Sequence, residues 1–446
     1  MFKRTIETSL KEWKQRKDRK VLVLRGARQV GKTTAVRHFG QNFGAFLYFN
    51  LEIPEERDLF EHAQSFDDLT AAMFLFKNIA RSDASVLIFV DEIQCSPKAV
   101  GWMRYFYEHA PQWHVVAAGS LLESAIDVDL HFPVGRVEYL FLKPATFKEF
   151  LAACKEDQLL GVLPNENVPD YAHDRLMKMF LVYALVGGMP EAVSEYAQNR
   201  DIVKVNAVYE RLLRAYIDDA AKYAARKASV NPLQYAVEAA FLHAGERIVF
   251  SKFSAAKYGS RKMSDALHTI ERAMLVTLMY PTTAVDIPMH IDRKKSPRLH
   301  VLDTGMLNFF AGVQKEFINA RDLNAVYRGV IAEHAVGQEL AAVHTGIADK
   351  IAFWVREKKQ SNAQVDYVIQ HDSRIIPIEV KSGEVGRLRS LHEFMGRCPH
   401  DIAVRVSGAR PRVDTVKTIA GKPFRLLNLP FYAVSDIHAH LDGMRT

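Results

Sequence analysis

Cysteine and long apolar runs are both scarce in this sequence. The 446 residues contain three cysteines, which are Cys95, Cys154 and Cys398. They lie too far apart to suggest a disulfide framework or a cysteine metal site, so we expect a protein of the reducing cytoplasm. No segment approaches the roughly 20 consecutive apolar residues that span a bilayer, so we expect no membrane partner.

The N-terminus lacks the apolar core of a signal peptide. Ile6, Leu10 and Trp13 instead repeat at helical spacing, which predicts an amphipathic helix. The whole chain is 48% hydrophobic and 25% charged, enough apolar material for three or four domains. Its net charge of +7 and pI near 9.1 permit contact with nucleic acid without requiring it.

A phosphate-binding loop stands out near the N-terminus. Residues 25–34 read RGARQVGKTT, a complete match to the pattern G-x-x-x-x-G-K-[ST] between a predicted strand and a predicted helix. Gly26 and Gly31 allow successive N–H groups to point at phosphate oxygens. Lys32 can reach the outer phosphates, and the Thr33 hydroxyl can bind Mg²⁺. The predicted nucleotide-binding residues are Gly26, Ala27, Arg28, Gln29, Val30, Gly31, Lys32, Thr33 and Thr34.

A second element lies about 60 residues further on. Residues 86–90 form an unbroken apolar run that predicts a buried parallel strand, and it ends in Asp91 and Glu92. Ligands of open α/β sheets bind at such strand ends. We predict that Asp91 holds Mg²⁺ through its waters and that Glu92 activates the attacking water.

Two further polar residues are candidates for the same chemistry. Ser120 follows the predicted strand at 114–118, where it could contact the terminal phosphate or merely cap the next helix. Arg136 precedes the strand predicted at 137–142, and it is either an arginine finger or one partner of a surface ion pair. Both alternatives stay open for each residue.

Together these motifs carry a family resemblance. They are the phosphate loop, VDEIQ at 90–94, AGSLL at 118–122, Gly135-Arg136 and VGGMP at 186–190. The chain resembles the prokaryotic AAA-type P-loop ATPases that continue into a helical lid, a winged helix and a restriction-endonuclease-like domain. This implies an α/β fold with an ATPase core at 1–155, a lid at 156–230, a winged helix at 231–315 and a nuclease-like domain at 316–446. It also implies ATP and Mg²⁺ as cofactors, a homo-oligomer, and Arg136 at the finger position.

The middle of the chain supports this division. Residues 170–225 have a helical pattern broken at 187–190, as expected for a lid, with Lys178, Arg211 and Arg214 as undecided nucleotide sensors. Helix, turn, helix and a hairpin with strands at 275–280 and 299–303 then predict a winged helix. Basic residues at 261–262 and 293–298 favour double-stranded DNA as its partner, through phosphate contacts. The alternative is a winged helix that docks another domain.

Residues 365–381 predict a β-hairpin that carries acids. If its turn is symmetric about residues 372–373, Asp366 lies opposite Glu379, with Cβ atoms roughly 5 Å apart. Lys381 lies on the same face as Glu379, two residues on. Facing acids destabilise a sheet unless a cation lies between them, so we predict Mg²⁺ or Mn²⁺ at Asp366 and Glu379, with Lys381 activating water.

The spacing Asp-x₁₂-Glu-x-Lys resembles the core of the PD-(D/E)xK nucleases. The resemblance implies a further metal-binding acid on an upstream helix, for which Glu333 is our choice and Glu339 the alternative. Gln364 departs from the acid expected before Val365. The domain is either an active nuclease or a relic that no longer cleaves.

The leading hypothesis is an ATP-hydrolysing, DNA-associated protein with a metal-dependent endonuclease-like module. Its predicted catalytic residues are Lys32, Glu92, Ser120, Arg136 and Lys381, and its predicted metal ligands are Thr33, Asp91, Glu333, Asp366 and Glu379. One alternative is an ATP-dependent switch whose C-terminal domain is an inactive scaffold for DNA or protein. Another is a toxin–antitoxin type regulator in which the winged helix binds protein.

Overall fold

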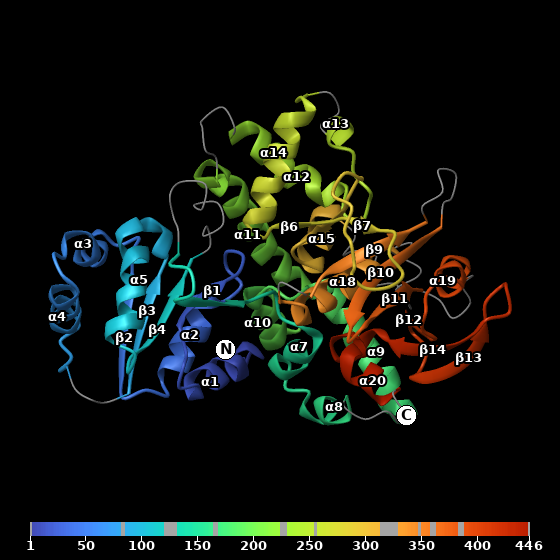
Figure 1. Cartoon of the computed structure of the whole chain (residues 1–446), viewed down its shortest axis with the longest axis horizontal. Helices are drawn as coiled ribbons and strands as arrows, with labels where there is room; N and C mark the ends of the chain where they lie inside the picture. Colours follow the sequence, from blue (N-terminus) through green and yellow to red (C-terminus); the bar gives the residue numbers. More distant parts are fainter. Residues whose placement is uncertain are drawn as a thin grey trace. The chain divides into compact units, whose positions relative to one another are not determined.

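The computed structural model describes residues 2–81, 85–119, 132–163, 168–223, 230–253, 257–312, 329–346, 349–356, 363–381 and 388–444. The chain forms two compact units (Figure 1). The N-terminal unit contains Lys3–Lys143, and the C-terminal unit contains Pro144–Glu271 and Leu275–Thr446. In the part described, no helix is long and apolar enough to cross a membrane.

A five-stranded parallel sheet organises the N-terminal unit. Its strand order is β2-β3-β4-β1-β5, and all its neighbouring strands pair in parallel. The strands are β1 (Val21–Arg25), β2 (Ala45–Asn50), β3 (Val86–Asp91), β4 (His114–Ala118) and β5 (Val137–Phe141). β3 and β4 are buried along their whole length, which is why their sequences are continuous apolar runs.

Helices cover both faces of this sheet. They are α1 (Ile6–Gln15), α2 (Lys32–Gly40), α3 (Pro54–His62), α4 (Phe66–Phe76) and α5 (Pro97–His109), with a short 3₁₀ turn, η1 (Ile93–Cys95), after β3. Val21 and Val23 pack with α3, α4 and α5 in one core cluster, and Figure 1 shows α1 and α2 on the opposite face. The predicted N-terminal amphipathic helix is confirmed as α1, which buries Ile6, Leu10 and Trp13.

The first half of the C-terminal unit is helical. It contains α7 (Phe147–Ala153), α8 (Asp157–Val162), α9 (Asp170–Val186), α10 (Pro190–Asn199), α11 (Ile202–Tyr223), α12 (Val230–Leu242), α13 (Phe250–Phe253) and α14 (Ser260–Arg272). α9 ends at Gly187 and α10 begins at Pro190, so the helical pattern breaks where the sequence predicts. Pro190 favours this restart because its fixed φ suits the first turn of a helix.

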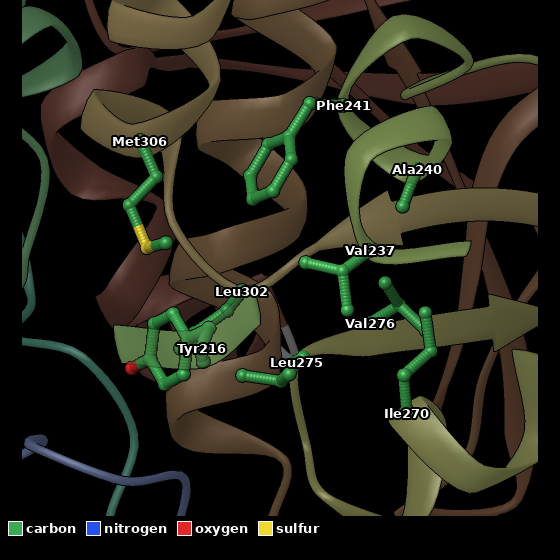
Figure 2. A pocket seen from close by; sticks show the side chains of 9 residues that line it. All are labelled: Tyr216, Val237, Ala240, Phe241, Ile270, Leu275, Val276, Leu302 and Met306. Atoms are coloured by element: carbon green, nitrogen blue, oxygen red, sulfur yellow. The ribbon is translucent and has the colours of Figure 1, made fainter. Parts of the chain in front are cut away.

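A small antiparallel sheet follows α14. It pairs β6 (Val276–Met279) with β8 (Arg298–Val301), and α15 (Thr304–Ala311) comes next. The predicted hairpin strands are thus present and shorter than expected. An apolar cavity beside this sheet is lined by Tyr216, Val237, Ala240, Phe241, Ile270, Leu275, Val276, Leu302 and Met306 (Figure 2). Its lining is almost entirely hydrocarbon and lacks the convergent polar groups of a ligand pocket, so we assign it to packing.

A seven-stranded mixed sheet forms the rest of the C-terminal unit, in the order β13-β14-β12-β11-β10-β9-β7. The strands are β7 (Pro281–Thr282), β9 (Ile351–Val355), β10 (Gln364–His371), β11 (Arg374–Val380), β12 (Ile402–Ser407), β13 (Arg412–Lys417) and β14 (Pro423–Pro430). The remaining helices are α18 (Val330–Val343), α19 (Arg389–Met395), the 3₁₀ turn η4 (Phe431–Asp436) and α20 (Ile437–Gly443). Because β7 pairs with β9, residues on both sides of the predicted boundary at 315/316 share this sheet.

The VGGMP motif at 186–190 contacts Asp303, the residue before α15. Asp303 is fully buried and caps α15 by accepting the Met306 N–H at 3.0 Å. It also accepts the Gly188 N–H at 2.5 Å and the Tyr209 hydroxyl at 2.9 Å. A Cβ at Gly187 would lie 2.3 Å from the Asp303 carboxylate. The glycines therefore allow the loop to close on this carboxylate, and we assign the VGGMP motif and Asp303 a structural role.

Candidate functional site

The phosphate loop joins β1 to α2, and two glycines shape it. A Cβ at Gly26 would lie 2.4 Å from the Leu142 carbonyl oxygen, so only glycine fits. Gly31 has φ 95°, a left-handed conformation that glycine adopts without strain. It directly precedes α2, whose first N–H groups have no partners within the helix. This is the backbone arrangement of an anion site at a helix N-terminus.

Lys32 points its ammonium group into this loop. Its side chain is buried and donates to the carbonyl oxygens of Gly26 at 2.9 Å and Ala27 at 3.0 Å. Burial lowers the pKa of Lys32 to about 8, although Glu92 and Asp91 favour its charged form. A bound phosphate would stabilise the charged form of Lys32, which burial disfavours.

Thr33, in the first turn of α2, contacts Asp91 at the carboxyl end of β3. The Thr33 hydroxyl donates to Asp91 Oδ2 at 2.6 Å, and Asp91 is buried. Burial raises the pKa of Asp91 despite this hydrogen bond. A hydroxyl and a carboxylate so placed are suitable oxygen ligands for Mg²⁺, directly or through water.

Glu92 follows Asp91 in a left-handed conformation, with φ 51°. In this conformation the backbone leaves the extended path of β3 at Glu92 and enters the η1 turn. The Gln94 amide donates to Glu92 Oε2 at 2.5 Å. Gln94 belongs to the VDEIQ motif, yet its role as the partner of Glu92 is evident only from the structure. An oriented carboxylate beside the phosphate loop is suited to act as a general base.

The two open alternatives at this site differ in outcome. Arg136 Nε donates to Glu108 Oε1 at 3.1 Å, and the arginine side chain is 40% exposed. The ion-pair alternative therefore holds within a single chain, and a role towards a neighbouring chain stays a prediction. Ser120 lies outside the described residues.

A second polar centre lies on the β10–β11 hairpin. The predicted register is confirmed, since Tyr367 pairs with Ile378 and His371 with Arg374. Asp366 and Glu379 are the next residues on the two strands. Asp366 Oδ2 accepts the Val380 N–H at 2.9 Å, which fixes this carboxylate at the strand end.

Glu333 and Lys381 complete a four-residue acid cluster with Asp366 and Glu379. Lys381 Nζ donates to Glu379 Oε1 at 2.7 Å. Glu379 is 5% exposed, and its Oε2 has no hydrogen-bond partner among the described residues. Glu333 lies in the first turn of α18 and interacts electrostatically with Asp366. The upstream acid chosen from the sequence thus belongs to the cluster.

Glu339, the alternative upstream acid, does not belong to the acid cluster. It is buried and accepts the Phe147 N–H at 2.9 Å and the Tyr183 hydroxyl at 2.6 Å, and so links α18 to α7 and α9. It lies six residues beyond Glu333, which rotates it to another side of α18. Glu339 is a structural residue, and the alternative was wrong.

Arg298 is the member of this centre that the sequence did not reveal. It was expected to contact DNA phosphates, but its side chain is buried, 4% exposed. Its guanidinium donates to the Asp366 carbonyl oxygen at 3.2 Å and lies 3.6 Å from Glu333 Oε2 and 4.0 Å from Asp366 Oδ1. The expectation fails because β8 directs this arginine into the protein, whereas exposed Arg293 and Lys294 precede the strand.

The cluster has more acid than base. Burial and the nearby Asp366 raise the pKa of Glu333 to about 7 and that of Glu379 to about 7. Burial also raises the pKa of Asp366, although Arg298 opposes the shift. Burial acts against the charge of Lys381, but the ion pair with Glu379 prevails and its pKa is raised. Among the described residues, these three acids thus lie beside two cations, Arg298 and Lys381, and one buried carboxylate oxygen has no hydrogen-bond partner. A bound cation would balance the remaining negative charge.

Three segments of the chain match models of known protein families. Residues 18–151 match the family model described as AAA domain, and residues 177–316 and 328–419 match two domains of unknown function, DUF8612 and DUF4143. No curated protein sequence matches the chain.

Residues 18–151 form an AAA-type P-loop ATPase domain.

Solved structures similar to the chain are remote. A Walker-type ATPase of Pyrococcus abyssi is 14% identical, with 70% of this chain and 96% of that chain covered and a TM-score of 0.45. C. elegans PCH-2 is 12% identical, with 46% and 67% covered and a TM-score of 0.30. A STAND ATPase of Pyrococcus horikoshii with a tetratricopeptide repeat sensor is 12% identical, with 75% and 46% covered and a TM-score of 0.28.

The AAA match covers the first centre and not the second. The phosphate loop, Asp91, Glu92 and Arg136 all fall within 18–151. Arg298 falls within the DUF8612 match, whereas Glu333, Asp366, Glu379 and Lys381 fall within the DUF4143 match. The acid cluster and the arginine that contacts it therefore belong to the matches of two different family models.

Proposed function

We propose that this chain is an ATP-hydrolysing, DNA-associated protein whose acid cluster binds a divalent cation and cleaves phosphodiester bonds. The observation that supports the second half is the convergence of Glu333, Asp366 and Lys381 on Glu379, whose buried Oε2 has no hydrogen-bond partner among the described residues. The AAA domain supports the first half.

In ATP hydrolysis, the loop N–H groups and Lys32 would bind the phosphates, and Thr33 and Asp91 would hold Mg²⁺. Glu92, oriented by Gln94, takes a proton from the attacking water. Positioning and charge stabilisation supply most of such catalysis, because phosphoryl transfer has a loose transition state.

We further propose that Arg136 completes the site of a neighbouring copy. The finger would have to leave Glu108, a half-exposed ion pair that contributes little free energy. A mixture of Arg136→Ala and Lys32→Ala chains tests this: each supplies what the other lacks, so ATP turnover should recover in mixed oligomers. Absence of recovery with a protein that stays monomeric in ATP would contradict it.

DNA is the proposed partner of the helix–hairpin segment. Arg261, Lys262, Arg293 and Lys294 are exposed and are the cations available for phosphate contacts. Filter binding of duplex DNA over a salt series should give affinities that fall steeply with salt. An affinity that salt leaves unchanged would favour the protein-docking alternative.

In the acid cluster, Asp366, Glu379 and Glu333 would hold a divalent cation, which would supply Lewis-acid activation of a phosphodiester. Lys381, held by Glu379, would orient water or stabilise the developing charge. Its raised pKa keeps it protonated at neutral pH, which favours charge stabilisation over proton abstraction.

One observation favours the inactive-scaffold alternative. Arg298 already supplies a cation to Asp366 and Glu333, so the cluster is partly neutralised without any metal. In that case the acids and Arg298 would join β8 to α18 and β10 as a structural ion network.

Plasmid cleavage with Mn²⁺ distinguishes an active nuclease from an inactive scaffold. The assay uses a Lys32→Ala background, which disables the nucleotide site. Glu379→Gln and Lys381→Met should each abolish cleavage. Glu339→Gln is the matched control, a buried acid of α18 outside the cluster, and should leave it intact. No cleavage by any protein, with no thermal stabilisation by Mn²⁺, would establish the scaffold.

A further inference from the structure

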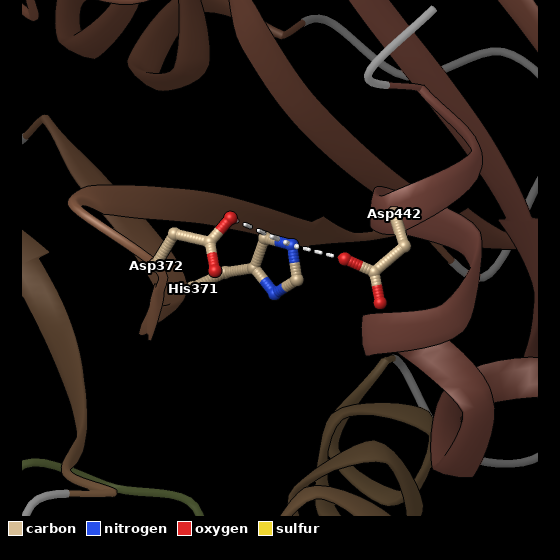
Figure 3. A group of neighbouring side chains, drawn as sticks. All are labelled: His371, Asp372 and Asp442. Carbon is tan, nitrogen blue, oxygen red and sulfur yellow. Dashed lines mark ion pairs between the residues drawn. The ribbon is translucent and has the colours of Figure 1, made fainter.

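A group of histidines and aspartates lies at the turn of the β10–β11 hairpin, the opposite end from the acid cluster. His371 ends β10, and Asp372 follows it in the turn with φ 51°. His438 and Asp442 lie four residues apart on α20, so they share one face of that helix. His344 follows α18. Figure 3 shows His371 between Asp372 and Asp442.

The three histidine rings form a chain of hydrogen bonds that begins at a backbone carbonyl. The Leu340 carbonyl can only accept, so His344 Nδ1 carries a proton and donates to it at 2.8 Å. His344 Nε2 of the neutral ring then accepts from His438 Nε2 at 2.9 Å. His438 Nδ1 in turn accepts from His371 Nδ1 at 2.8 Å.

The chain ends at His371 Nε2, which is left with a lone pair. His371 is 8% exposed, and its Nε2 has no hydrogen-bond partner within the described ranges. Nε2 faces Asp442 Oδ1 at 3.4 Å and Asp372 Oδ2 at 3.8 Å, and all three atoms lie within 4.8 Å of one another. A lone pair directed at two carboxylates is repulsive unless a cation lies between them.

We propose that His371 Nε2, Asp372 and Asp442 bind a divalent transition-metal ion of the zinc type. An imidazole nitrogen with two carboxylates suits Zn²⁺ and Co²⁺ better than Mg²⁺, which prefers oxygen alone. The half-exposed aspartates, 53% each, leave the ion open to water for its remaining positions.

His438 and His344 have a positioning role in this site. Metal-binding histidines usually donate their second N–H to a fixed acceptor, which sets the tautomer and the orientation of the ring. Here the acceptor is His438, held in turn by His344 and the Leu340 carbonyl. This chain of contacts explains why three histidines from three separate segments meet.

Zinc binding to the full-length protein tests the proposal. With Mg²⁺ and ATP analogue in excess to fill the other cation sites, wild type should bind one more Zn²⁺ than the Asp372→Asn/Asp442→Asn double variant. The same site loaded with Co²⁺ should give visible d–d absorption that the double variant lacks. Glu379→Gln, in the acid cluster, is the control and should keep this Zn²⁺.

A His438→Ala variant should retain the stoichiometry and bind Zn²⁺ about 10- to 100-fold more weakly, as expected for loss of an orienting partner. Unchanged ATP hydrolysis and circular dichroism verify that each variant folds. Equal Zn²⁺ binding by wild type and the double variant would overturn the proposal. So would wild type that binds no Zn²⁺ at micromolar concentrations.

Discussion

The nucleotide site and the acid cluster bury charges of opposite sign. In the nucleotide site a buried cation, Lys32, donates among the described residues only to carbonyl oxygens of its own loop. In the acid cluster three carboxylates share Arg298 and Lys381. Burial lowers the pKa of Lys32 to about 8 and raises that of Glu379 to about 7. In each centre burial thus destabilises the charged form of a side chain, and a ligand of opposite charge would stabilise that form.

The two centres also differ in how the chain builds them. Most of the nucleotide site is one continuous loop followed by a helix, completed by a single strand end. The acid cluster is assembled from α18, β10, β11 and the residue after β11, and Arg298 joins it from β8. A local site withstands changes elsewhere, whereas an assembled site depends on the packing of every segment. The predictions below test this difference.

The largest effect is expected at the nucleotide site. Lys32→Ala should weaken ATP binding by about 100-fold or more, because buried phosphate charge loses its cationic partner. Glu92→Gln should keep ATP affinity and lower turnover by about 100-fold or more, because an amide cannot accept the proton. Fluorescent-nucleotide titration and phosphate release measure the two. Equal turnover by Glu92→Gln and wild type would remove Glu92 from catalysis.

Arg298→Met should destabilise the metal-free protein by about 3 kcal/mol at neutral pH, since it leaves buried acids without a cation. Arg293→Met, an exposed arginine just before the same strand, should change stability by no more than about 0.5 kcal/mol. Urea unfolding in EDTA measures both. Comparable values for the two variants would mean that Arg298 does not hold the cluster together.

Glu339→Gln separates a structural acid from the cluster by its pH dependence. Burial raises the pKa of Glu339 to about 7 in the folded protein, above its unfolded value. Its protonated form therefore contributes stability that is complete below about pH 4.5 and is lost as the pH rises through about 7, about 3 kcal/mol in all. The Gln variant should lack this part of the slope. Parallel stability curves from about pH 5 to about pH 8 would contradict the assignment.

Among substitutions of Arg298 and the acid cluster, the smallest effect on stability is expected from Asp366→Asn. It removes a repulsion with Glu333 and an attraction to Arg298, and the amide oxygen can still accept from Val380. Metal-free stability should therefore change by no more than about 1 kcal/mol. The stabilisation by Mn²⁺ should disappear, because a ligand that binds only the folded state stabilises through its affinity. Thermal melts in the Lys32→Ala background test this, and Mn²⁺ stabilisation retained in Asp366→Asn would exclude Asp366 as a ligand.

By itself, the sequence determined the features that depend on neighbouring residues. The phosphate loop, the Asp91–Glu92 strand end, the amphipathic α1 and the hairpin register follow from motif, period and turn symmetry, and the structure has all four. Such features are predictable because the interactions that fix them span few residues. The same reasoning extended to Glu333 only through a resemblance, which made Glu333 the choice and left Glu339 as the alternative.

Only the tertiary structure decided which distant side chains meet. Arg298 belongs to a basic run by sequence, yet β8 buries it beside Asp366, 68 residues later in the chain. His371, His438 and His344 have no metal-binding spacing, but the hairpin turn, α20 and the end of α18 bring their rings together. Asp303 and Gly188 are 115 residues apart and share a hydrogen bond. These contacts are set by which faces of strands and helices pack in the core, and no local pattern of residues contains that information.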